Sequence, residues 1–304
     1  MDDKIVQVQH LRKAYANYVA IEDVNFDVHR GEIFGLLGPN GAGKTTTLEI
    51  LEGLRQPDAG FIRVLSLDPS REAHRLQNLI GIQLQASGMP DSITVREAMD
   101  FFCAYHRIAP RMDLLERLEL QEKLNTQHYM LSTGQKRRLA LALAIAHKPA
   151  LIFLDEPTAA LDVISRSELH AVIRELQDEG TTIILSSHDM AEVEKLTSRV
   201  AILLHGEIVA IGTPNELTAT GAGLTKISIH TEHSSLNEDV NVPAVSQRML
   251  KDEYDVFFST DPAVTVSALL DYIKAHQDPL IDLRVERPSL EERFLEITTQ
   301  KEMA

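Results

Sequence analysis

A glycine-rich segment in the first fifty residues has residue types and spacing that suit the binding of phosphate groups. Residues 38–46 read Gly-Pro-Asn-Gly-Ala-Gly-Lys-Thr-Thr and fit the pattern G-x-x-x-x-G-K-T. Glycines carry no side chain, so backbone N–H groups can close around phosphate oxygens. Lys44 adds a positive charge, and the Thr45 hydroxyl can ligate Mg²⁺. The segment predicts a site for the β- and γ-phosphates of a nucleoside triphosphate.

The flanking residues support a phosphate-binding loop. The apolar run at 32–37 is typical of a buried strand, and residues 44–54 are typical of a helix that follows the loop. The positive end of that helix dipole would face the phosphates. An accidental Gly-Lys-Thr in a glycine-rich turn is the alternative, and the flanks disfavour it. The candidate phosphate-binding residues are Gly38, Pro39, Asn40, Gly41, Ala42, Gly43, Lys44, Thr45 and Thr46.

Two acidic residues at the end of a second apolar strand are the next candidates for chemistry. The run Leu151–Asp155 predicts a strand, and Glu156 follows it directly. Because the carboxyl ends of parallel strands meet at one edge of a sheet, both carboxylates should lie beside the phosphate loop. Asp155 would bind Mg²⁺ directly or through water, and Glu156 would orient or deprotonate the water that attacks the γ-phosphate. Alone, the pair could equally be the start of a loop; the phosphate loop favours the catalytic interpretation.

The elements that position these residues follow from the hydrophobic periodicity. Residues 5–8 and 19–28 predict an antiparallel pair of strands, and 86–148 is mostly helical, with a capping box at Thr94 and Glu97. Strands and helices then alternate, which indicates an α/β fold with a largely parallel sheet and helices on both faces. Further strands are expected at 62–65, 79–84, 151–155, 181–186, 199–204 and 208–211, and helices at 111–120, 165–179 and 190–196.

Composition and charge restrict the class of protein. The chain has 304 residues, 44% of them hydrophobic, and no apolar stretch is long enough to span a bilayer. The acidic N-terminus lacks a signal-peptide pattern, and the single cysteine, Cys103, suits a reducing compartment. A net charge of -15 argues against extended contact with nucleic acid. We therefore expect a protein that works inside the cell, with one large domain and a small one, or with two domains.

A capped helix between the phosphate loop and the acidic strand decides the family. Residues 131–135 read Leu-Ser-Thr-Gly-Gln and precede an Ala/Leu-rich helical run at 136–147. Ser132 is a good N-cap, so physical chemistry alone indicates an ordinary helix start. In combination with the phosphate loop and the acidic strand, the segment resembles the signature motif of ABC ATPases.

The resemblance extends over residues 4–218 and includes the remaining motifs of that family in order. It implies a P-loop ABC ATPase core with a mainly parallel sheet, an antiparallel β subdomain, and a helical subdomain at about 86–148. The matching residues are Gln85 (Q-loop), Asp162 (D-loop), His188 (switch histidine) and Tyr15 (the aromatic residue that stacks on adenine), with Tyr18 close to the last of these.

The ligands that the resemblance implies are ATP and Mg²⁺. Gln85 would touch Mg²⁺ and the attacking water, and would report that contact to the helical subdomain. His188 would bridge the γ-phosphate and Glu156, and this bridge would hold the water in line. The expected catalytic residues are Lys44, Gln85, Glu156 and His188, and the expected metal ligands are Thr45, Gln85 and Asp155.

The resemblance also implies a head-to-tail dimer of two nucleotide-binding subunits. Ser132, Gly134 and Gln135 of one subunit would meet the ATP held by Lys44 of the other, and Asp162 would lie across the interface. A two-fold axis makes this contact twice, so the dimer closes. A complete set of motifs makes a homodimer possible, and a heterodimer remains open.

Two positions depart from the family pattern. Thr133 stands where the family often has glycine, and a threonine would be strained there if the backbone needed a positive φ. Ala160 replaces the usual glycine of the D-loop, for which we expect little effect. Every catalytic position is retained, so the sequence predicts competent hydrolysis.

Residues 221–304 predict a small accessory α/β domain after an ABC ATPase domain at 1–220. Strands are expected at 224–230 and 280–286, and helices at 265–276 and 290–297. Ser289 and Glu292 form a capping box for the last helix. Residues 288–295 are similar to the tail of ATP-binding subunits in drug-export-type and other type-2 ABC transporters. The domain would either support dimerisation or regulate transport, or it would be a stabilising appendage.

The resemblance favours the ATP-hydrolysing subunit of an ABC exporter at the cytoplasmic face of the plasma membrane. Its partners would be separate integral membrane permease subunits, docked near Gln85 and residues 86–107, and a second ABC subunit; no nucleic acid is expected. The alternative is a soluble ABC ATPase of translation or DNA repair, which usually has two cassettes, coiled-coil arms or zinc-binding cysteines. A regulatory subunit without activity is disfavoured by the intact Glu156 and His188. The sequence does not identify the cargo.

Overall fold

The computed structural model describes residues 3–84, 88–219, 224–236, 240–286 and 289–302. The chain divides into two compact units, Met1–Pro214 and Asn215–Ala304. Of the residues proposed above for chemistry, Gln85 lies outside the described ranges, as does Pro288 of the C-terminal motif. Within these ranges, every helix is too short or too polar to cross a lipid bilayer.

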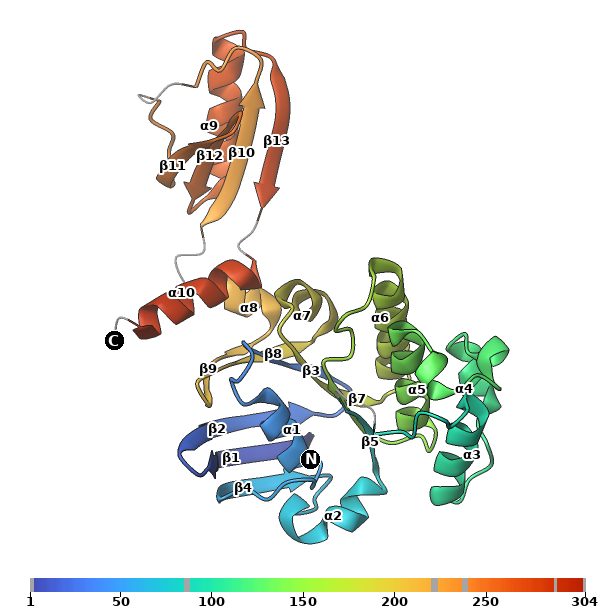
Figure 1. Ribbon diagram of the computed structural model, residues 1–304. Helices are drawn as coiled ribbons and strands as arrows, with labels where there is room; N and C mark the ends of the chain where they lie inside the picture. Colours follow the sequence, from blue (N-terminus) through green and yellow to red (C-terminus); the bar gives the residue numbers. More distant parts are fainter. Residues whose placement is uncertain (1–2, 85–87, 220–223, 237–239, 287–288, 303–304) are drawn as a thin grey trace. The chain divides into compact units, whose positions relative to one another are not determined.

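A single mixed sheet forms the centre of the first unit. In the described part of the chain it has nine strands, in the order β4-β1-β2-β9-β8-β3-β7-β6-β5 (Figure 1). The strands are β1 (Lys4–Tyr15), β2 (Tyr18–His29), β3 (Ile33–Leu37), β4 (Ala59–Val64), β5 (Ile80–Gln83), β6 (Leu151–Asp155), β7 (Thr182–Ser187), β8 (Arg199–Leu204) and β9 (Glu207–Gly212).

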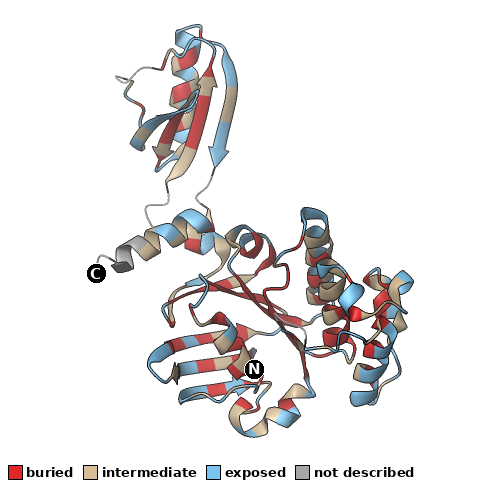
Figure 2. Cartoon of the chain, viewed as in Figure 1, coloured by how far each residue is buried: buried red, intermediate tan, exposed pale blue. Residues whose placement is uncertain are grey.

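The strand pairing confirms the predicted α/β fold with an antiparallel subdomain. Strand β3 pairs in parallel with β7 and β8, and β6 pairs in parallel with β5 and β7. Strand β1 pairs antiparallel with β2 and β4, and β8 turns into β9 as a hairpin. Every residue of β3, β6 and β7 is buried (Figure 2), which fits parallel strands covered on both faces.

Helices cover the sheet and form a separate group at residues 88–148. Helix α5 packs on β5 and contacts α3 and α4, as Figure 1 shows in green. Leu48 of α1 belongs to the same core as Phe34 and Phe153 of the sheet. The helices are α1 (Lys44–Leu51), α2 (Pro69–Gln77), α3 (Val95–Tyr105), α4 (Met112–Arg117), α5 (Thr133–Ile145), α6 (Val163–Asp178) and α7 (Met190–Leu196), with 3₁₀ turns at Gln121–Lys123 and His128–Met130.

Local capping explains where several helices begin and end. Thr94 and Glu97 form the predicted reciprocal capping box of α3. Helix α4 is shorter than predicted, because the chain leaves the helical region at Leu118 and Glu119 has a φ of 56°. Helix α2 was not predicted, although Asp68 caps it and Pro69 is its first residue, a common helix start.

The second unit is an antiparallel sheet with a helix packed on it. The strand order is β11-β12-β10-β13, and α9 contacts β10. Ile227, Phe257, Leu269 and Ile273 belong to its core. The sequence predicted β10, β13 and the two long helices but not β11 and β12. The elements are α8 (Pro214–Ala219), β10 (Thr225–Thr231), β11 (Val245–Lys251), β12 (Tyr254–Ser259), α9 (Pro262–Ala275), β13 (Leu280–Glu286) and α10 (Leu290–Glu302).

Candidate functional site

Three loops meet at the carboxyl edge of the parallel strands. The phosphate loop joins β3 to α1, Glu156 follows β6, and His188 follows β7. Strands β3, β7 and β6 are consecutive neighbours in the sheet. Residues that are more than a hundred positions apart in the chain are therefore adjacent in space, as expected at the edge where α/β sheets bind ligands.

Two glycines of the phosphate loop are required by close backbone contacts. A Cβ atom at Gly38 would lie 2.3 Å from the Leu203 carbonyl oxygen. Gly43, the N-cap of α1, has a φ of 107°, and a Cβ there would lie 2.6 Å from the Ala20 carbonyl oxygen. The first N–H groups of α1 have no acceptor within the helix, so the loop offers them to an anion.

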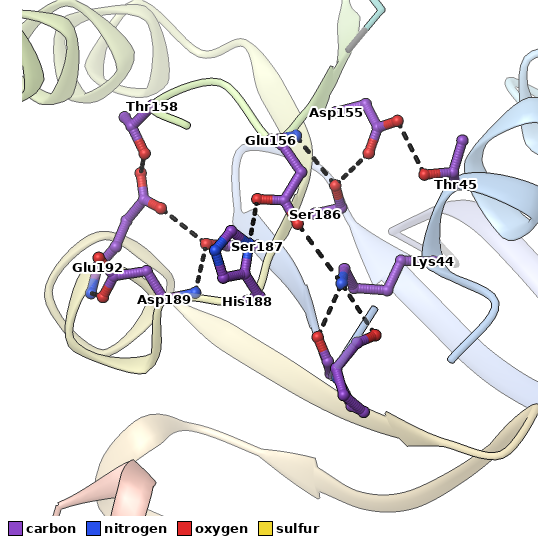
Figure 3. Close-up of polar contacts among 12 residues, drawn as sticks. Lys44, Thr45, Asp155, Glu156, Thr158, Ser186, Ser187, His188, Asp189 and Glu192 are labelled. Atoms are coloured by element: carbon purple, nitrogen blue, oxygen red, sulfur yellow. Dashed lines mark hydrogen bonds and ion pairs between the residues drawn. The ribbon is translucent and has the colours of Figure 1, made fainter. Parts of the chain in front are cut away.

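The Lys44 amine is buried among acceptors (Figure 3). It donates hydrogen bonds to the carbonyl oxygens of Gly38, at 2.7 Å, and Pro39, at 3.3 Å. Its third neighbour is the Glu156 carboxylate, 3.4 Å away. Only 6% of Lys44 is exposed, so the charge is held within the loop. Phosphate oxygens are stronger acceptors than carbonyls and would compete for the same amine.

Asp155 accepts hydrogen bonds from two side-chain hydroxyl groups. The Thr45 hydroxyl donates to one carboxylate oxygen at 3.0 Å, and the Ser186 hydroxyl donates to the other (Figure 3). Asp155 is 3% exposed. A hydroxyl and a carboxylate are oxygen ligands of the type that Mg²⁺ prefers, so the pair of Thr45 and Asp155 fits a magnesium site.

Glu156 joins the phosphate loop to the histidine after β7. Its carboxylate lies 2.7 Å from His188 Nδ1 on one side and close to the Lys44 amine on the other. The Glu156 backbone has a φ of 50°, an unfavourable region for a residue with a side chain. Its N–H group donates to the carbonyl and hydroxyl oxygens of Ser186, at 3.3 and 3.0 Å, which hold the backbone in that conformation.

A buried glutamate close to Asp155, Glu52, has a raised pKa, which favours its protonated form. Glu52 closes the C-terminal end of α1 and is 1% exposed. Burial, followed by the negative charges of Asp155 and Glu49, raises the pKa of Glu52 to about 8. The site therefore carries less negative charge than its number of carboxyl groups suggests.

A cavity of about 380 Å³ opens at the phosphate loop. It includes both tyrosines of the β1–β2 turn, Tyr15 and Tyr18. The Arg55 guanidinium lies 5.2 Å from the Tyr15 ring centroid. The Tyr18 hydroxyl donates to the Gly41 carbonyl at 2.8 Å, a contact that the sequence did not reveal. The lining residues are Tyr15, Tyr18, Ala20, Pro39, Asn40, Gly41, Gly43, Lys44, Thr45, Thr46 and Glu156.

Comparisons with known proteins assign the chain to a family. A family model described as ABC transporter matches residues 21–159. Linearmycin resistance ATP-binding protein LnrL of Bacillus subtilis is 32% identical, over 97% of this chain and 98% of its own length. The chain belongs to the ABC transporter ATP-binding proteins. The resemblance drawn from the motifs is thereby confirmed, and the protein is an ABC ATPase.

Two further relatives of the ABC ATPase are similar over most of their lengths. Nod factor export ATP-binding protein I of Ralstonia nicotianae is 32% identical, over 97% of this chain and 94% of its own length. The ATP-binding cassette MJ0796, solved as a dimer in a post-hydrolysis state bound to ADP and Pi, is 25% identical with a TM-score of 0.64. That similarity covers 68% of this chain and 98% of the cassette. Neither name points to translation or DNA repair.

The signature residues of the ABC ATPase lie apart from the cavity of their own chain. Ser132, Gly134 and Gln135 are absent from its described lining. The Ser132 hydroxyl accepts from the Gln135 N–H at 3.2 Å, and the Gln135 side chain accepts from the Ser132 N–H at 3.0 Å. Thr133 is the first residue of α5 and does not have a positive φ, so the threonine is unstrained.

The D-loop of the ABC ATPase ends in a helix cap. The Asp162 carboxylate accepts hydrogen bonds from the N–H groups of Ile164 and Ser165, both at 3.0 Å. The hydrogen bonds from Ser165 contribute most to lowering the pKa of Asp162, and that from Ile164 contributes less. Ala160 has a φ of 62°. The glycine that the family usually has there would relieve this strain, which costs a residue with a Cβ about 1–2 kcal/mol. The expectation of little functional effect at Ala160 stays a prediction.

Proposed function

We propose that this ABC ATPase powers export through separate integral membrane permease subunits, as a peripheral subunit at the cytoplasmic face of the plasma membrane. The observation that carries the proposal is the extent of its similarity to LnrL and to Nod factor export protein I. Both matches cover 97% of this chain, so they include residues of the second unit as well as the cassette. Both relatives are named for resistance or export.

The residues of the site support an assignment of roles toward ATP. Lys44 and the first N–H groups of α1 would bind the β- and γ-phosphates, and Tyr15 or Tyr18 would face the base. Thr45 and Asp155, with Gln85, would hold Mg²⁺. When bound, Mg²⁺ would neutralise part of the negative charge of the phosphate groups.

Glu156 and His188 would act on the attacking water. Phosphate oxygens would draw the Lys44 amine away from Glu156, which frees that carboxylate oxygen to accept a hydrogen bond from water. The other oxygen stays with His188 Nδ1. Glu156 would then orient the water and accept its proton as the new oxygen–phosphorus bond forms and the bond from the γ-phosphorus to the β–γ bridging oxygen breaks, which releases ADP and phosphate.

A second ABC subunit would complete the site. Ser132, Gly134 and Gln135 are exposed or half-buried and lie outside the cavity of their own chain, so a partner copy is the simplest source of a signature motif at the γ-phosphate. The dimeric MJ0796 cassette supports this arrangement. The full motif set favours a homodimer with two active sites, which a two-fold axis would close.

An apolar groove beside β5 and α3 would receive the permease. Its volume is about 520 Å³, and Phe101 at its edge is 65% exposed. A groove of this kind fits the apolar face of a short helix from a membrane subunit. Leu84, which directly precedes Gln85 in the chain, lines the groove, so we expect docking there to affect Gln85. Its lining includes Ile82, Leu84, Met89, Ile93, Phe101, Phe102, Ala140 and Leu143.

The test is affinity capture from native membranes with the Glu156→Gln protein and MgATP, followed by mass spectrometry. We expect recovery of a multi-span membrane protein, because slow hydrolysis should hold the dimer closed on its partner. Lys44→Ala, which removes the phosphate-binding amine, is the matched control and should lose ATP-dependent capture. Recovery of ribosomes or DNA-repair proteins without any membrane protein would overturn the transporter proposal.

A further inference from the structure

A buried carboxylate outside the nucleotide cavity connects the elements of the site. Glu192 lies in the first turn of α7 and is 4% exposed. Its carboxylate accepts hydrogen bonds from side chains of three different segments. These donors are Thr158, Ser187 at 2.7 Å, and His170 Nε2 at 3.0 Å.

Two of the three donors flank catalytic residues in the sequence. Thr158 stands two residues after Glu156, in the loop that leads to Asp162. Ser187 is the last residue of β7 and directly precedes His188. Figure 3 shows Thr158 and Ser187 on either side of the Glu192 carboxylate. The carboxylate therefore ties the loop that carries Glu156 to the loop that carries His188.

The backbone on the other side of His188 belongs to the same network. The Asp189 N–H donates to the Ser187 hydroxyl at 3.0 Å, and the Glu192 N–H donates to the Asp189 carboxylate at 3.0 Å. Arg166 of α6 donates to the second oxygen of Asp189 at 2.9 Å. His188 is thus positioned through both of its chain neighbours, Ser187 and Asp189. Helix α6 begins after Asp162 and supplies Arg166 and His170 to the same network.

A glutamate is not needed here for helix capping or for filling space. Asp189 already caps α7. Burial would raise the pKa of Glu192, but hydrogen bonds from His170, Thr158 and Ser187 outweigh burial and lower it, so the group is a buried anion. A buried carboxylate is costly unless its hydrogen bonds are made, whereas an apolar side chain of that size would pack without this cost. What Glu192 adds is the connection between the loops.

We propose that Glu192 is a positioning residue that couples the D-loop segment at 156–162 to His188 and thereby sets the rate of ATP hydrolysis. This inference rests on the proposed roles of Glu156 and His188. A displacement of the D-loop segment, as dimer closure would produce at Asp162, reaches Ser187 through Thr158 and the Glu192 carboxylate. Glu192 itself is absent from the described lining of the nucleotide cavity.

The test compares Glu192→Gln with Glu194→Gln, the same change on an exposed glutamate two residues away on α7. An amide cannot accept from all three donors, so we expect the kcat of Glu192→Gln to fall about tenfold with the KM for ATP unchanged. Glu194→Gln should hydrolyse ATP at the wild-type rate. Equal kcat values for the two variants, or a rise in KM without a fall in kcat, would overturn the proposal.

Two further comparisons separate positioning from a general loss of structure. In single-turnover assays, Glu192→Gln added to His188→Ala should cause no further loss, because Glu192 acts through that histidine. A second, full loss in the double variant would contradict the proposal. Thr158→Ser, which keeps the hydroxyl, should retain kcat, while the isosteric Thr158→Val should lower it. Failure of the wild-type protein to hydrolyse ATP would instead count against the roles assigned to Glu156 and His188.

Discussion

Two buried aspartates, one in each unit, are held in different ways. Asp155 of the cassette accepts hydrogen bonds from side-chain hydroxyl groups, those of Thr45 and Ser186. Asp278 of the second unit accepts from the backbone N–H groups of His233 and Ser235, both at 2.8 Å. Burial would raise the pKa of Asp278, but hydrogen bonds from Ser235, first through its side chain and then through its N–H, from the His233 N–H and from the Thr231 side chain hold the pKa well below the usual range.

The difference separates a site from a structural turn. A hydroxyl group can rotate and give its lone pairs to a metal ion or a phosphate, so the contacts of Asp155 can be exchanged during a reaction. Backbone N–H groups are fixed by the fold, so the hydrogen bonds that Asp278 accepts from the N–H groups of His233 and Ser235 hold a turn in place. Buried polar groups therefore mark chemistry where their partners are mobile side chains from several segments, as they are around Asp155 and Glu156.

The largest effect expected from this comparison is on hydrolysis. Glu156→Gln removes the general base and should lower the ATPase rate by a factor of about 10²–10⁴ while ATP still binds. Steady-state phosphate release and nucleotide-binding titrations measure the two quantities. Wild-type turnover in this variant would remove Glu156 from the mechanism.

A large loss of stability without loss of activity is expected in the second unit. Leu269 of α9 is fully buried in its core, so Leu269→Ala should lower the unfolding free energy of that unit by about 2–5 kcal/mol. Limited proteolysis should then cut first within 215–304 and leave a stable fragment at 1–214. A parallel loss of ATPase activity would show that the two units do not unfold separately.

The same Asp→Asn substitution at Asp155 and at Asp278 tests directly whether one aspartate is catalytic and the other structural. Asp278→Asn should lower the melting temperature of the second unit and leave the ATPase rate unchanged, because an amide nitrogen cannot accept from a backbone N–H. Asp155→Asn should lower the ATPase rate and leave the melting temperature of the second unit unchanged. Calorimetry and an ATPase assay on both variants measure these effects. The same phenotype in both variants would contradict the distinction between a catalytic Asp155 and a structural Asp278.

A further predicted effect is a change in the pH dependence of stability caused by Glu52. Its pKa is about 8 in the folded protein and 4.5 in an unperturbed chain, so between these values only the folded state keeps the proton. The Glu52 contribution to the free energy of unfolding therefore falls as pH rises from about 4.5 to about 8. Glu52→Gln lacks this slope, and its stability relative to wild type should increase over that range in urea unfolding. Parallel curves would contradict a neutral Glu52.

Much of the fold could be predicted because its signals are local. The alternating apolar strands from Leu151 onward, the capping boxes at Thr94 and Ser289, and the turn at His205 each depend on a few consecutive residues. Strands β11 and β12 were missed because their exposed and buried residues alternate weakly. The last four residues of β11 are all apolar or basic, and three of them are exposed. Helix α2 was missed although Asp68 and Pro69 mark its start.

The sequence alone determined the family and the chemistry of single residues. A phosphate-binding loop is a contiguous string whose geometry follows from its glycines, Lys44 and the helix behind it, so the string can be recognised without the fold. Only the tertiary structure decided which side chains meet. Tyr18 contacts Gly41, and Glu192 joins Thr158, His170 and Ser187, because neighbouring strands and helices bring separate segments to one edge of the sheet. Hydrogen bonds between distant residues leave no periodic trace in the sequence, and so they become visible only when the chain has folded.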